Sequence, residues 1–170
     1  MAVRRAFDLA VGFPAAIVAL PIVALLTLLV AVTSGFPVFL VQERVGAGER
    51  RIQVVKFRTM RRGVPIVAKS LLRPDPGLYT PLGPFLRRSS LDELPQLWNV
   101  LRGELSIIGP RPALPSQDDL LALRRRHGIT EDKPGITGLA QVLGRESLTL
   151  ATTGRTGFGR VSARSRPADP

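Results

Sequence analysis

Residues 90–112 read SLDELPQLWNVLRGELSIIGPRP, and this stretch contains two adjacent acidic side chains and one constrained arginine. Asp92 and Glu93 stand near its start, and Arg111 closes it between two prolines that restrict the backbone. Carboxylates among arginines and stiff turns are typical of phosphate chemistry with a metal. The pattern Ser90-x-x-Glu93 also matches a capping box, in which serine caps a helix and glutamate reaches back. Both interpretations stay open, because a helix N-terminus favours an ionised carboxylate.

A helix is predicted after the acidic pair. Pro95 can occupy its first turn, and Gly103 supplies a C-terminal stop. Between them, apolar residues recur at helical spacing, and most are expected in the core: Leu94, Leu97, Trp98 and Leu101. A short buried strand is predicted next, over residues 105–108.

Composition restricts the class of function. The chain has 170 residues, enough for one domain with a small appendage, and its net charge of +11 implies an anionic partner. Aromatic residues make up only 5% of the chain, which disfavours stacking of single-stranded nucleic acid. There is no cysteine and only one histidine, His127, so disulfides, thiolate chemistry and His-rich metal sites are excluded. Carboxylates and arginines must therefore perform any catalysis.

The N-terminal part predicts a membrane segment. Residues 9–41 contain no charge, and this run is long enough to enter a bilayer. Arg4 and Arg5 precede it and several basic residues follow it, whereas positive charge marks the cytoplasmic side. Pro21 predicts a sharp kink near its middle. We therefore expect a re-entrant helix that breaks at Pro21 and returns, with a single spanning helix and a signal peptide as alternatives.

The remaining pattern predicts an α+β fold. A hairpin is expected over residues 36–57 with its turn at Gly46 and Gly48, and Lys56 and Arg58 would share one face after it. That face either binds phosphate or is a solvated edge with lipid-facing cations. Residues 81–88 are expected to form an amphipathic helix on the membrane surface. The predicted parts are a membrane helix (1–36), a compact cytosolic catalytic domain (37–150) and a disordered tail (151–170).

Five motifs in order give the chain a family resemblance. They are Gln42-Glu-Arg-Val-Gly46, Lys56-Phe-Arg-Thr-Met60, Ser90-Leu-Asp-Glu-Leu-Pro-Gln96, Gly109-Pro-Arg-Pro112 and Pro134-Gly-Ile-Thr-Gly-Leu-Ala-Gln141. From about Arg4 to Arg145 the chain resembles the small bacterial sugar transferases. These are the monotopic polyprenyl-phosphate phosphoglycosyl transferases that begin the assembly of surface glycans and exopolysaccharides.

The resemblance implies a mechanism and a set of site residues. In the family, the aspartate of the Asp-Glu pair attacks the sugar-linked phosphate of a UDP-sugar and displaces UMP, with Mg²⁺ bridging the phosphates. The phosphosugar then passes to polyprenyl phosphate. By this resemblance Asp92 is the nucleophile and a metal ligand, Glu93 is its catalytic neighbour, and Pro21 is the helix break. Phosphate and substrate binding is implied for Arg87, Arg111, Lys56, Arg58, Gln141 and Arg145.

The resemblance also implies partners and a location. The partners are a UDP-sugar, polyprenyl phosphate and the membrane, with other glycan-assembly enzymes as a further candidate and nucleic acid not expected. The location is the cytoplasmic (inner) membrane, with the catalytic domain on its cytoplasmic face. Past Arg145 the chain is unlike the family. Two functions therefore stay open: the transferase, and a truncated inactive homologue that acts as a membrane-bound interaction protein or binds anionic lipid.

Overall fold

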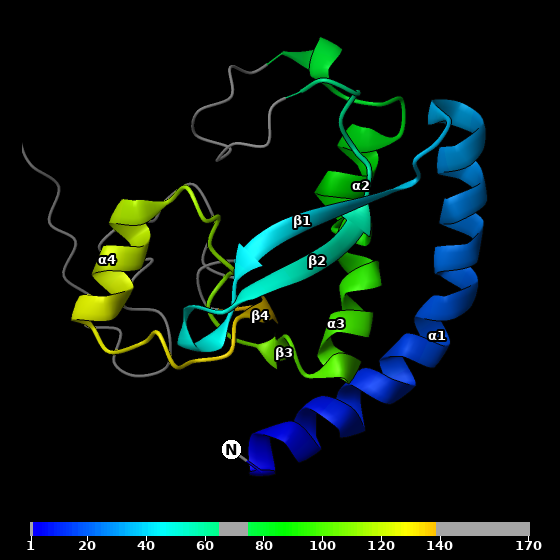
Figure 1. The fold of residues 1–170 in the computed structure, drawn as a ribbon. Coiled ribbons are helices and arrows are strands. Elements are labelled where there is room, and N and C mark those ends of the chain that lie inside the picture. The colour runs from blue at the N-terminus through cyan, green and yellow to red at the C-terminus, as the bar shows by residue number, and fades with distance from the viewer. Residues whose placement is uncertain (1, 65–74, 139–170) are drawn as a thin grey trace, which may run out of the picture.

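A computed structural model describes residues 2–64 and 75–138 of the protein, arranged beside one long helix (Figure 1). The elements are α1 (Ala2–Ser34), β1 (Phe39–Val45), the 3-10 helix η1 (Ala47–Glu49), β2 (Arg51–Phe57), the 3-10 helix η3 (Pro76–Leu78), α2 (Gly83–Ser89), the 3-10 helix η4 (Leu91–Gln96), α3 (Leu97–Arg102), β3 (Ser106–Ile108), α4 (Asp118–Arg126) and β4 (Gly135–Thr137). The predicted α+β class is confirmed. The tail predicted over 151–170 lies outside the described residues.

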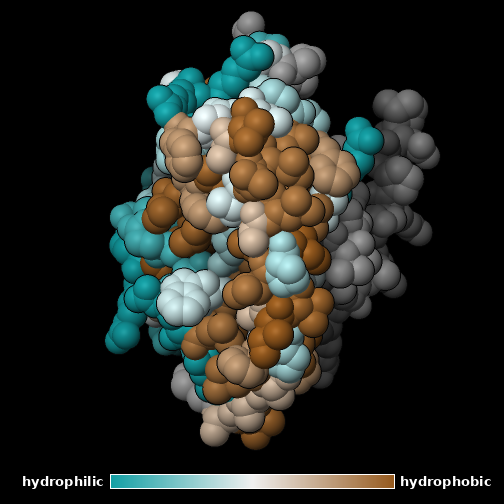
Figure 2. All heavy atoms as spheres, turned by 90° about the vertical axis from the view of Figure 1, so that its right-hand side faces the viewer, coloured by the Kyte–Doolittle hydropathy of each residue, from teal (hydrophilic) through white to brown (hydrophobic). Residues whose placement is uncertain are grey.

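Helix α1 is long and apolar enough to cross a membrane, by length and composition. It continues through Pro14 and Pro21, and Figure 1 shows it curving rather than stopping. The break predicted at Pro21 is therefore not seen as an interruption of the helix. Prolines bend a helix because each removes one backbone hydrogen bond and crowds the preceding turn. Large apolar side chains stay exposed along α1, and apolar surface dominates the face it presents in Figure 2.

The first turns of α1 are fastened to α3 and β3. Arg5 donates to the carbonyl oxygens of Val100 (2.6 Å) and Leu101 (2.5 Å), near the C-terminal end of α3. Asp8 is fully buried and accepts a hydrogen bond from the Ser106 hydroxyl at 2.8 Å. Bonds to charged groups contribute about 1.5–3 kcal/mol each, so this end of α1 is firmly docked.

The far end of α1 is held by the hairpin. The Arg58 guanidinium, just after β2, donates to the carbonyl oxygens of Ser34 (2.5 Å) and Gly35 (2.7 Å). These carbonyls belong to the last turn of α1 and the residue after it, where a cation also complements the helix dipole. Both ends of a helix about 50 Å long therefore contact the same folded unit.

The hairpin predicted over residues 36–57 is confirmed. β1 and β2 are antiparallel, and Leu40 faces Lys56 across the ladder. Val30, Phe57 and Leu86 are completely buried in one cluster that joins α1, β2 and α2. This core attaches the hairpin to the helices that precede the acidic pair.

Two expectations for residues 90–103 are wrong. Ser90 makes no capping hydrogen bond with its side chain, because it adopts a left-handed backbone (φ 59°) between α2 and η4. The acidic pair instead lies in the 3-10 helix η4, and the α-helix begins only at Leu97 before ending at Gly103 as predicted. Of the four apolar residues expected mostly in the core, Leu94, Leu97 and Leu101 are partly buried, whereas Trp98 is 60% exposed.

Candidate active site

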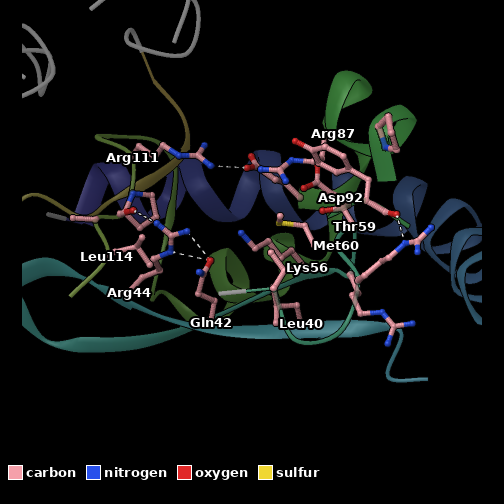
Figure 3. A pocket seen from close by; sticks show the side chains of 18 of the residues that line it. Leu40, Gln42, Arg44, Lys56, Thr59, Met60, Arg87, Asp92, Arg111 and Leu114 are labelled. Atoms are coloured by element: carbon pink, nitrogen blue, oxygen red, sulfur yellow. Dashed lines mark hydrogen bonds and ion pairs between the residues drawn. The ribbon is translucent and has the colours of Figure 1, made fainter. Parts of the chain in front are cut away.

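A cavity of about 800 Å³ lies between the hairpin, α2, η4 and the segment after β3 (Figure 3). Two acidic residues, Asp92 and Glu93, line it together with nine basic ones. The basic residues are Arg44, Lys56, Arg58, Arg61, Arg62, Arg87, Arg88, Arg111 and Arg124. Because cations greatly outnumber carboxylates, the cavity suits a ligand with several negative charges.

Asp92 places a mostly buried carboxylate in this cavity. The residue is only 8% exposed, and burial raises the pKa of its carboxyl group, followed in effect by repulsion from Glu93. Lys56 and Arg87 oppose this and lower the same pKa. A desolvated carboxylate close to cations and a cavity is typical of catalytic carboxylates.

Glu93 and Arg111 form an ion pair at the wall of the cavity, with Nη2 of Arg111 3.1 Å from Oε1 of Glu93. The Glu93 carboxylate is therefore used in a tertiary contact rather than in a helix cap. In Figure 3, Arg111, Asp92 and Arg87 lie on one side, while Gln42, Arg44 and Lys56 rise from the strands opposite.

Two arginines that the sequence interpretation did not assign to the site hold the backbone of Arg111. Arg124 of α4 is buried and donates to the carbonyl oxygen of Arg111 at 2.6 Å. Arg44 of β1 donates to the next carbonyl oxygen, that of Pro112, at 3.0 Å, and its other contacts go to Gln42. Burial lowers the pKa of Arg44 to about 10, with repulsion from Arg111 as a second cause. Consecutive carbonyls are thus fixed from two directions.

Two glycines bring the Gly109–Pro112 and Pro134–Gln141 motifs together. A Cβ on Gly135 would lie 2.1 Å from the backbone nitrogen of Gly109, so no larger residue fits. The N–H of Gly135 donates to the carbonyl of Pro110 at 2.9 Å, and β3 pairs with β4 in parallel. The turn before Arg111 is therefore closed by the second motif.

Lys56 reaches the cavity from β2. It shares a face with the β1 residues Leu40, Gln42 and Arg44, because alternate strand residues point to the same side. Burial lowers the pKa of Lys56 to about 8, and Arg44 and Arg111 lower it further, while Asp92 and Glu93 raise it. The ammonium group is thus held in a position where its charge is costly.

Arg87 and Arg58, both predicted to bind phosphate, are placed differently. The Arg87 guanidinium lies over the ring of Tyr79, 5.4 Å from its centre, beside Asp92. Arg58 lines the cavity, but its Nη2 atom bonds the end of α1. Among the described residues, no partner contacts its buried Nε and Nη1 atoms.

The structure therefore gathers six of the eight predicted site residues around one cavity: Asp92, Glu93, Lys56, Arg58, Arg87 and Arg111. Gln141 and Arg145 lie outside the described residues. Arg44 belongs to a recognised motif and could have been found there. Arg124 is one of three consecutive arginines, and the sequence does not single it out by residue type. Its helical spacing could have identified it, because it lies four residues after the buried Leu120 and therefore on the same helix face.

Asp92 and Glu93 could hold Mg²⁺ only together with phosphate groups of a substrate. Within the described ranges, no three acidic, histidine or cysteine side chains gather into a complete metal site. Mg²⁺ is commonly held by one or two carboxylates together with substrate phosphates. Asp92, with Glu93 beside it, meets that requirement in a cavity lined by nine basic side chains.

Comparison with known proteins agrees with the geometry. The family model described as bacterial sugar transferase matches residues 1–160. The UDP-galactose-lipid carrier transferase of Erwinia amylovora is 36% identical over 88% of this chain and 34% of its own length. The exopolysaccharide production protein ExoY of Sinorhizobium fredii is 33% identical over 88% of this chain and 72% of its own length.

A third relative has a more specific name. The UDP-glucose:undecaprenyl-phosphate glucose-1-phosphate transferase of Caulobacter vibrioides is 41% identical over 73% of this chain and 47% of its own length. The chain thus spans only about a third of the first relative, half of the third and most of the second. Since the family model covers nearly the whole sequence, this chain belongs to the bacterial sugar transferase family.

Proposed function

We propose that the chain is a phosphoglycosyl transferase that moves a sugar-1-phosphate from a UDP-sugar to polyprenyl phosphate and releases UMP, initiating surface glycan or exopolysaccharide assembly. The observation that supports this most directly is the buried Asp92 carboxylate in a cation-lined cavity of about 800 Å³. The names of the relatives, which include UDP-sugars, undecaprenyl phosphate and exopolysaccharide, point to the same reaction.

In the first step, a carboxylate oxygen of Asp92 attacks the phosphorus that carries the sugar. The bond from this phosphorus to the bridging oxygen breaks, and UMP leaves with the electron pair. A phosphosugar remains on Asp92 as an acyl-phosphate. Lys56 and Arg87, whose charges act on Asp92, are positioned to offset the charge of the diphosphate.

In the second step, a phosphate oxygen of the lipid attacks the same phosphorus. The bond between phosphorus and the Asp92 oxygen breaks, which restores the carboxylate and yields a polyprenyl diphosphosugar. Arg111, paired with Glu93 and held by Arg44 and Arg124, is positioned to orient a phosphate in either step. Mg²⁺, held by Asp92 and the substrate phosphates, would neutralise the charge that develops on the departing UMP.

We place the protein at the cytoplasmic membrane as a monotopic protein, with α1 re-entrant and the catalytic domain on the cytoplasmic face. Arg5 and Asp8 attach the first turns of α1 to α3 and β3, and Arg58 attaches its last turn to the hairpin. A helix whose two ends dock on one folded unit is poorly suited to cross a bilayer core of about 30 Å. In this proposal residues 1–36 are the membrane part and residues 37–150 the catalytic part.

UMP release from a panel of UDP-sugars tests the proposal, with polyprenyl phosphate and Mg²⁺ in detergent. We expect release with at least one UDP-sugar and formation of a lipid-linked product. The panel would also identify the sugar. If the folded protein releases no UMP from any donor in the presence of Mg²⁺, the result would favour the inactive membrane-bound homologue.

A further inference from the structure

A second cavity, of about 750 Å³, lies between α1 and the segment that contains the acidic pair. Its walls are mostly apolar, with Val18 and Ile22 from α1, Leu94 and Leu97 from η4 and α3, and Ile136 from β4. Such a volume is in the range of small-molecule sites, about 300–1,000 Å³. We call this cavity the α1 groove.

The α1 groove meets the polar cavity at one residue. Among the described residues, Glu93 is the only one that lines both cavities and the only charged one that lines the groove. A small hollow of about 10 Å³ between them is lined by Arg111, Glu93 and Ile136. An apolar channel therefore ends beside the ion pair of the candidate active site.

The α1 groove is also continuous with the apolar exterior. Val18 is 69% exposed and Ile22 is 41% exposed, although both line the groove. They are among the large apolar side chains that are exposed along α1. An apolar ligand can thus move from a bilayer around α1 into the groove without crossing water.

We infer that the α1 groove binds the first isoprenoid units of the polyprenyl phosphate acceptor and delivers its phosphate to the edge formed by Glu93 and Arg111. This inference rests on the proposed function. A nucleotide-sugar is a poor occupant, because no basic side chain among the described residues lines the groove. A polyprenyl phosphate matches both ends, since its chain is apolar and its phosphate can bind the Arg111 guanidinium.

The arrangement also separates the two substrates. The UDP-sugar enters the cation-lined cavity, and the lipid arrives from the side of α1. Since Asp92 and Glu93 both line the cation-lined cavity and repel each other electrostatically, a phosphate beside Glu93 is close to the proposed acyl-phosphate. The two substrates can therefore meet at the reacting phosphorus while sharing, among the described lining residues, only Glu93.

Cysteine protection gives a direct test, because the natural chain has no cysteine. Leu97→Cys would lie in the groove, and Leu20→Cys, on the outer face of α1 at 70% exposure, is the control. Both variants, in nanodiscs, are treated with a membrane-permeant maleimide, with and without polyprenyl phosphate. We expect polyprenyl phosphate to slow labelling at Leu97→Cys about tenfold and to leave Leu20→Cys unchanged.

Three results would overturn the inference. Equal protection by phosphatidate would show a general lipid site. A Leu97→Cys thiol that is unreactive even without added lipid would show that the chain itself, such as residues after Gly138, fills the groove. Undiminished labelling with saturating polyprenyl phosphate would equally exclude the groove.

Groove filling gives an independent kinetic test. Ala15→Phe places a large ring in the groove, whereas Ala24→Phe makes the same change at an exposed position outside it. We expect Ala15→Phe to raise the KM for polyprenyl phosphate about tenfold, and Ala24→Phe to keep the wild-type value. Equal KM values in the two variants would contradict the inference. The wild-type UMP burst without acceptor is measured separately, so its absence would count against the proposed function and not against the groove.

Discussion

Replacing Lys56 by methionine should stabilise the folded protein while it impairs the reaction. Methionine has a similar length and no charge, so it removes the cost of burying an ammonium group beside Arg44 and Arg111. The pKa of Lys56 is lowered from its usual 10.5 to about 8. At 1.36 kcal/mol per pKa unit, the charged side chain costs about 3 kcal/mol of folding free energy at pH 7.

The pH dependence of this gain has a definite sign. The pKa of Lys56 is lower in the folded state than in the unfolded chain, so its cost is fully present below about pH 8. Between about pH 8 and pH 10.5 the folded state releases its proton first, and the wild-type protein becomes relatively more stable. The advantage of Lys56→Met should therefore be largest at pH 7 and disappear above pH 10.5.

Chemical unfolding in detergent at pH 7 and at about pH 10 measures this difference. Lys133→Met serves as the control, because Lys133 does not line the cavity. A Lys56→Met protein that is less stable than wild type at pH 7, or an advantage that does not shrink at high pH, would refute the argument.

The same pKa values predict the activity profile. UMP release by the wild-type protein should decline above about pH 8 as Lys56 loses its charge. It should also decline at acidic pH, at a value higher than usual for aspartate, because burial and Glu93 raise the pKa of Asp92. Lys56→Met should lose the alkaline limb, release UMP about tenfold more slowly or worse, and move the acid limb to higher pH.

Three further predictions concern the surroundings of the site. Glu93→Gln should unfold at nearly the wild-type denaturant concentration but lose most UMP release, because an amide cannot form the ion pair with Arg111; full activity in a kinetic assay would refute this. Arg124→Leu should raise the KM for the UDP-sugar about tenfold and change kcat much less, because it removes the hydrogen bond to the carbonyl oxygen of Arg111. A kcat that falls by the same factor as KM rises would indicate a different role. Cysteines at Ala2 and Ala47 should both resist an impermeant thiol reagent applied outside intact cells, and labelling at Ala2 alone would exclude a re-entrant α1.

Much of the architecture follows from local sequence signals. The apolar run of residues 9–41 predicts α1, and β-prone runs around Gly46 and Gly48 predict the hairpin, because periodicity and turn residues act over short distances. The stop at Gly103 is likewise a local feature. The motif residues Lys56 and Arg111 were predicted to bind phosphate, and this stays a prediction; their arrangement around one cavity is a tertiary property.

The missed features depend on contacts between distant segments. Asp8 is an acidic residue at the edge of an apolar run, and only its distance of 2.8 Å from the Ser106 hydroxyl shows why it is buried. Arg58 has the spacing of a phosphate ligand, yet its guanidinium bonds the end of α1, 23 residues before it in the chain. The capping box at Ser90 is absent because Ser90 adopts a left-handed backbone between two helices, and the Glu93 carboxylate pairs with the distant Arg111.

Detection of a phosphosugar on Asp92 is the most direct test of the proposed covalent mechanism. The purified protein is mixed with a UDP-sugar and Mg²⁺ without lipid acceptor, quenched, and analysed by intact-protein and peptide mass spectrometry. The account predicts a phosphosugar adduct on Asp92 that disappears when polyprenyl phosphate is added and never forms in Asp92→Asn. Steady turnover by Asp92→Asn, or an adduct on any other residue, would contradict it.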